Sequence, residues 1–143
     1  MSNSIFQNYI AGEWVDGTSS IANISPGDSS DTIGHYAQAD AEQTRAAIAA
    51  AQCGQIEWQK SGLEQRYTVL MNIGNELIER CLELGTILAR EEGKTIAEGK
   101  GEVYRSGQFF QYYAAEVLRQ MGETAESVRP NVSIETYREP VGV

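Results

Sequence analysis

The chain has 143 residues, of which 41% are hydrophobic and 22% are charged, and this balance is typical of a globular protein the size of one domain. Its 20 acidic and 11 basic side chains give a formal net charge of −9, and the basic residues form no run. Nucleic acids and anionic membrane surfaces attract clustered Lys and Arg side chains, so the charge argues against both as partners.

The first 39 residues predict a β-rich lead-in. In "NYIAGEWV" an apolar pair stands on each side of Ala11-Gly12, which is typical of a hairpin. "IANIS" and "TIGHYA" are two further predicted strands, and "PGDSSD" between them predicts a turn. Strands so few and short do not make an independent domain.

Residues 40–122 predict a helical section. Asp40 is a candidate N-cap before an alanine-rich helix, and Ser61 with Glu64 predicts a capping box that opens the next helix. In this second helix the apolar side chains recur at spacings of three, four and seven and form one stripe: Leu63, Tyr67, Leu70, Leu77, Ile78 and Cys81. Gly93 predicts the end of the helical pattern that follows.

The longest predicted helix spans about residues 96–121 and opens at a capping box of Thr95 and Glu98. Gly99, Gly101 and Gly107 interrupt it, each at a cost of about 1 kcal/mol relative to alanine, so we expect another element to approach closely there. Residues 123–131 predict a linker, and residues 132–143 predict the start of a strand region that is truncated at Val143. The chain is thus divided into two parts. Residues 1–131 hold the lead-in, the helices and the linker, and residues 132–143 hold the strand region.

Two glycine motifs resemble nucleotide-binding loops. "EEGKT" would need a further glycine at Leu88, which lies in mid-helix, so the motif predicts a helix end at Gly93 and a helix start at Thr95. "GKGEVY", residues 99–104, lacks the third glycine of the dinucleotide fingerprint and follows a helix start instead of a strand. Close helix packing is the favoured interpretation.

No residue is predicted to be catalytic, cofactor-binding or metal-binding. His35 is the only histidine and has no nucleophile beside it in sequence, while Cys53 and Cys81 lie in helical patterns and are interpreted as packing residues. An aromatic cluster could form a partner surface, although core packing is the simpler account of at least half of it: Phe109, Phe110, Tyr112 and Tyr113. The N-terminus carries no signal-peptide pattern, no apolar stretch is long enough to span a bilayer, and unpaired cysteines favour a reduced, cytoplasmic setting.

In order and spacing, these segments resemble the N-terminal part of the NAD(P)-dependent aldehyde dehydrogenase superfamily. "YIAGEWVDG" is similar to its opening hairpin, "ISPGDSSDTIGHYAQADAEQ" to its turn, strand and helix start, and "LAREEGKTIAEGKGEV", "FFQYYAAE" and "REPVGV" to later segments. Ser25 is a departure, because the family usually has Asn before this proline. The bacterial semialdehyde dehydrogenases, such as α-ketoglutarate semialdehyde dehydrogenase, are the most similar members.

The resemblance implies an α/β fold: the N-terminal hairpin and helical part of an incomplete Rossmann-type cofactor domain, ending in oligomerisation strands. It implies a homo-oligomeric enzyme, a dimer or tetramer, in which a thiolate attacks the aldehyde, hydride passes to NAD or NADP, and a glutamate-activated water releases the carboxylate. The thiol, the glutamate and the cofactor motif would follow Val143, so the chain alone is expected to be inactive and to bind the cofactor poorly. The oligomerisation hairpin would be residues 133–143, cut in its second strand, and in some members a structural cation implicates Ile24 and Glu102.

Two other interpretations remain open. The chain could be a non-enzymatic relative that acts as an interaction or assembly module, or a stand-alone helical binding module.

Overall fold

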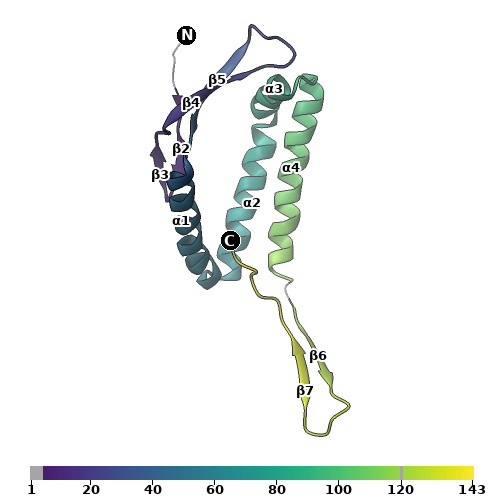
Figure 1. Ribbon diagram of the computed structural model, residues 1–143. Helices are drawn as coiled ribbons and strands as arrows, with labels where there is room; N and C mark the ends of the chain where they lie inside the picture. Colours follow the sequence, from purple (N-terminus) through teal and green to yellow (C-terminus); the bar gives the residue numbers. More distant parts are fainter. Residues whose placement is uncertain (1–4, 120) are drawn as a thin grey trace.

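The computed structural model describes residues 5–119 and 121–143 (Figure 1). The helices in these residues are α1 (Ala41–Lys60), α2 (Leu63–Glu79), α3 (Cys81–Glu92) and α4 (Ile96–Val117). The strands are β1 (Ile5–Phe6), β2 (Asn8–Ile10), β3 (Glu13–Val15), β4 (Ser19–Ile24), β5 (Thr32–Gln38), β6 (Glu123–Glu126) and β7 (Ser133–Thr136). The mixed α/β composition agrees with the predicted fold class.

The predicted opening hairpin is confirmed as β2 and β3. Its turn consists of Ala11 and Gly12, whose φ angles of 55° and 87° are those of a tight turn that matches the twist of the strands. Tyr9 and Trp14 face each other across the hairpin with ring centroids 4.8 Å apart. The aromatic contact therefore stabilises the register that the turn sets.

The two other predicted strands are confirmed as β4 and β5, which pair antiparallel. β1 adds to β5 in parallel, so the strand order of this sheet is β1-β5-β4. Ala37 on β5 is buried, whereas Ile21 on β4 is 58% exposed. The sheet is thus only partly covered in this chain.

The helix starts agree with the sequence at Asp40 but not at Ser61. Asp40 accepts a hydrogen bond from the backbone N–H of Gln43 at 2.8 Å, as expected of an N-cap. Because α1 continues to Lys60, Ser61 becomes its C-cap and its hydroxyl donates to the Trp58 carbonyl oxygen. The N-cap of α2 is Gly62, without a side-chain hydrogen bond, so the predicted Ser61–Glu64 capping box is wrong.

α2 and α3 run up one side of a helical hairpin and α4 runs back down the other (Figure 1). Gly74 of α2 meets Gly107 of α4 so closely that a Cβ atom on Gly107 would lie 2.7 Å from the Gly74 carbonyl oxygen. Higher up, a Cβ atom on Gly85 of α3 would lie 2.5 Å from the Lys100 Cα atom of α4. Backbone-to-backbone contact of this kind requires glycine.

The prediction of close approach is therefore confirmed for Gly99 and Gly107 but wrong for Gly101. Gly99 is buried against Gly85 and Ala89, whereas a Cβ atom on Gly101 would meet no atom within 4 Å. Gly101 is two positions from Gly99, which places it on another side of the helix.

The segment expected to be a linker instead contains strand β6, which pairs antiparallel with β7. Both strands of this hairpin lie in residues 123–136, so the expected hairpin at 133–143, cut in its second strand, is placed wrongly; residues after Thr136 form no strand. α4 also ends at Val117, earlier than the expected residue 121. The sequence "ETAE" has no apolar alternation because both faces of the projecting hairpin are exposed (Figure 1).

A bidentate ion pair joins the turn between β4 and β5 to the end of α3. The Asp31 carboxylate accepts hydrogen bonds from Arg90 Nε at 2.8 Å and from Arg90 Nη2 at 2.6 Å. These bonds hold the pKa of Asp31 below its ordinary value. Because both side chains are only partly exposed, this pair is less screened than an ordinary surface pair.

Few side chains are buried in the described residues. The buried apolar residues are small ones at the sheet and between the helices: Ala37, Ala89, Val103 and Ala114. The accessible surface is 10980 Å², against roughly 7,300 Å² from the scaling law for a folded monomer of 15.7 kDa. The helices and strands therefore present more uncovered surface than a compact domain of this size.

We predict that Gly107→Ala destabilises the chain and that Gly101→Ala on the same helix does not. The new Cβ atom at residue 107 would lie 2.6 Å from Ile78 Cγ1, which should cost about 1–3 kcal/mol of unfolding free energy. At residue 101 the space is open, so the better helix propensity of alanine should stabilise by up to about 1 kcal/mol. Urea unfolding followed by circular dichroism measures both, and equal shifts of the two variants would contradict the packing.

We also predict that Asp31→Asn flattens the acid dependence of stability. The pKa of Asp31 is lower in the folded chain than in the unfolded chain, where it is about 4. The ion pair therefore stabilises the fold fully above about pH 4, and this stabilisation is lost as the pH falls through the folded-state pKa of Asp31. Between neutral pH and acid, the melting temperature should fall less in Asp31→Asn than in the unsubstituted chain. Arg90→Gln should show the same flattening, and an unchanged acid profile in both variants would rule out the ion pair.

Candidate functional site

The two sequence motifs "ISPG" and "EEGKT" lie against each other in the structure. Gly93 ends α3 in the left-handed conformation, with φ 69° and ψ 32°, which confirms the predicted helix end. A Cβ atom on Gly93 would lie 3.0 Å from the Pro26 Cγ atom, so the turn after β4 rests directly on this glycine. Ser25 at the base of the turn is buried, and its backbone N–H donates to the Asp31 carbonyl oxygen at 3.0 Å.

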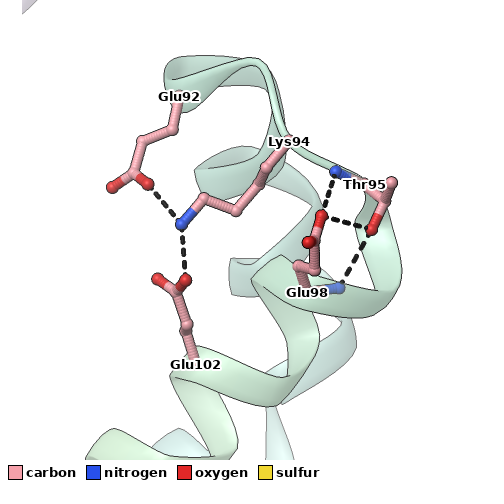
Figure 2. A network of polar contacts seen from close by, with 5 residues as sticks. All are labelled: Glu92, Lys94, Thr95, Glu98 and Glu102. Atoms are coloured by element: carbon pink, nitrogen blue, oxygen red, sulfur yellow. Dashed lines mark hydrogen bonds and ion pairs between the residues drawn. The ribbon is translucent and has the colours of Figure 1, made fainter.

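Lys94 follows Gly93 and forms the centre of a charged network (Figure 2). Its ammonium contacts Glu102 Oε1 at 2.7 Å and also the carboxylate of Glu92, and the side chain is only 18% exposed. The hydrogen bonds to Glu102 and Glu92 raise the pKa of Lys94. The amine therefore stays charged at neutral pH, which suits a structural tie between α3 and α4 and not a nucleophile or base.

The start of α4 is closed by the predicted capping box, which is confirmed (Figure 2). Thr95 Oγ1 accepts from the backbone N–H of Glu98 at 3.3 Å, and Glu98 Oε2 accepts from the Thr95 backbone N–H at 3.0 Å. The Thr95 hydroxyl also donates to Glu98 Oε2 at 2.7 Å, and these bonds lower the pKa of Glu98. "EEGKT" is thus a helix boundary, as predicted, and Leu88 lies inside α3.

The structure does not bring His35, Cys53 and Cys81 together into one site. His35 is half-buried in the middle of β5, and Cys81 is half-buried at the first position of α3. Cys53 is exposed on α1, so the packing interpretation is wrong for this residue within the chain. The reason is that α1 has no buried residue at all.

The Glu102 carboxylate, which the family resemblance links to a structural cation, is already bound by the Lys94 ammonium. Ile24, the other implicated residue, lies at the end of β4 with 50% exposure. Within residues 5–119 and 121–143, no group of three or more His, Cys, Asp or Glu side chains has the arrangement of a metal site. Nor is any helix of this part of the chain long and apolar enough to cross a membrane.

The aromatic cluster on α4 points outward, which contradicts the expectation that half of it packs in the core. Its four side chains are all exposed, between 36% and 61%: Phe109, Phe110, Tyr112 and Tyr113. Tyr112 and Tyr113 meet edge to face at 5.3 Å, and the Arg105 guanidinium lies 5.2 Å from the centre of the Phe109 ring. The partner-surface interpretation of this cluster stays a prediction.

Two features had no signal in the sequence. The Asp31–Arg90 pair joins residues 59 positions apart, and no local pattern indicates such a partner. Likewise, Arg66 near the start of α2 and Arg138 in the C-terminal segment line one cavity, although 72 positions separate them (138 − 66).

Comparison with known proteins relates this geometry to one family. Residues 14–143 match the profile described as "Aldehyde dehydrogenase family". Succinate-semialdehyde dehydrogenase (NADP+) 1 of Schizosaccharomyces pombe is 30% identical over 96% of this chain, and the α-ketoglutarate semialdehyde dehydrogenase of Haloferax volcanii is 33% identical over 96%. The chain covers 28% and 29% of these two proteins, so it spans less than a third of their length.

Solved structures give the same result. The succinate-semialdehyde dehydrogenase of Burkholderia pseudomallei superposes with a TM-score of 0.88 at 30% identity, over 95% of this chain and 28% of that protein. An aldehyde dehydrogenase of Brucella melitensis superposes with a TM-score of 0.89 at 25% identity, over 95% of this chain and 28% of that one. The family profile covers every residue except the first thirteen. The chain therefore belongs to the aldehyde dehydrogenase family and is homologous to the N-terminal portion of its members.

Proposed function

We propose that this chain is the N-terminal portion of an NAD(P)-dependent aldehyde dehydrogenase that oxidises an aldehyde or semialdehyde to a carboxylate. The observation that carries the proposal is the continuous similarity of almost the whole chain to semialdehyde dehydrogenases in both sequence and structure. The relatives include succinate-, α-ketoglutarate-, malonate- and glutarate-semialdehyde dehydrogenases. A semialdehyde, which carries a second acidic group, is therefore the favoured substrate class.

The proposal gives this segment a structural role, because its residues do not fit a dinucleotide. A phosphate-binding fingerprint needs glycines in a turn between a strand and a helix. Here Gly99 lies inside α4, buried against the backbone of Gly85, so a pyrophosphate has no access to it. The cofactor, the thiol nucleophile and the glutamate base belong, in this proposal, to the part of the enzyme that follows Val143.

The segment would contribute apolar helix faces and the β6–β7 hairpin to the assembled enzyme. Large side chains such as Ile56, Leu82 and Phe109 are 53%, 59% and 53% exposed in this chain. Among the residues that the structure describes, the two hairpin strands pair only with each other, which leaves their outer edges open. Both features suit burial against further chain in a homo-oligomer, and the free thiols of Cys53 and Cys81 suit a reducing, cytoplasmic setting.

A second candidate function is a non-enzymatic assembly module. The large accessible surface favours it, because the same uncovered faces could dock on another subunit. The two candidates differ in whether a polypeptide that carries this segment also oxidises aldehydes.

We predict that the polypeptide isolated from its native source reduces NAD or NADP when a semialdehyde is supplied, and that the 143-residue chain alone does not. The measurement is the absorbance of the reduced cofactor, with the intact mass of each sample determined in parallel. Cys53→Ser should leave the activity of the isolated enzyme unchanged, because this exposed thiol has no assigned role. Activity in the 143-residue chain, or a longer polypeptide inactive with every aldehyde supplied, would contradict the proposal.

We further predict that the 143-residue chain associates or binds a dye specific for apolar surface. The reason is its accessible surface of 10980 Å², well above that of a compact domain. Analytical ultracentrifugation and dye fluorescence at several concentrations measure this. A monomer that binds no dye and melts sharply would show that the uncovered faces need no partner, and an endogenous complex of fixed stoichiometry without activity would favour the assembly module.

A further inference from the structure

We draw no further inference here: the strongest candidate, the exposed aromatic face of α4 formed by Phe109, Tyr112 and Tyr113, is an unpartnered apolar surface, and nothing in residues 5–119 and 121–143 shows what covers it.

Discussion

The structure depends on backbone contact between α4 and the α2–α3 side of the helical hairpin. Glycine pairs at two levels, Gly74 with Gly107 and Gly85 with Gly99, leave no space for a Cβ atom between the helices. Half-buried side chains such as Leu70, Leu77 and Leu84 add to this cohesion, although none of the large side chains described is fully buried. Close packing of backbone therefore contributes a large share of the contact between the helices.

This packing places the polar turn at the top of the hairpin. Because α3 and α4 are fixed side by side, Lys94 can join Glu92 to Glu102 across the turn, and Gly93 offers a flat surface to Pro26. The Asp31–Arg90 pair then fixes the β4–β5 turn on the same helix end. Two of the motifs that carry the family resemblance, "ISPG" and "EEGKT", therefore form one structural unit, in which every described contact is structural.

Local signals predicted the parts of the fold that local interactions determine. The Ala11-Gly12 hairpin and the caps at Asp40, Gly93 and Thr95 follow from residues within four positions of one another. The failures have a common cause, namely that the deciding partner is distant or absent. Strand β6 is set by pairing with β7 and not by its own pattern. The sequence of the aromatic cluster on α4 is compatible with a core, and only the structure shows that the described residues leave these side chains exposed. The cavity of Arg66 and Arg138 likewise required three-dimensional structure.

Native-state hydrogen exchange of the 143-residue chain tests most directly whether the glycine-packed hairpin holds the fold together. Amides in the middle of α2, α3 and α4 should be the most protected, and α1 and the β6–β7 hairpin should exchange much faster, because little of either is covered. Protection of α1 or of the β6–β7 hairpin equal to that around Gly74 and Gly107 would contradict this account.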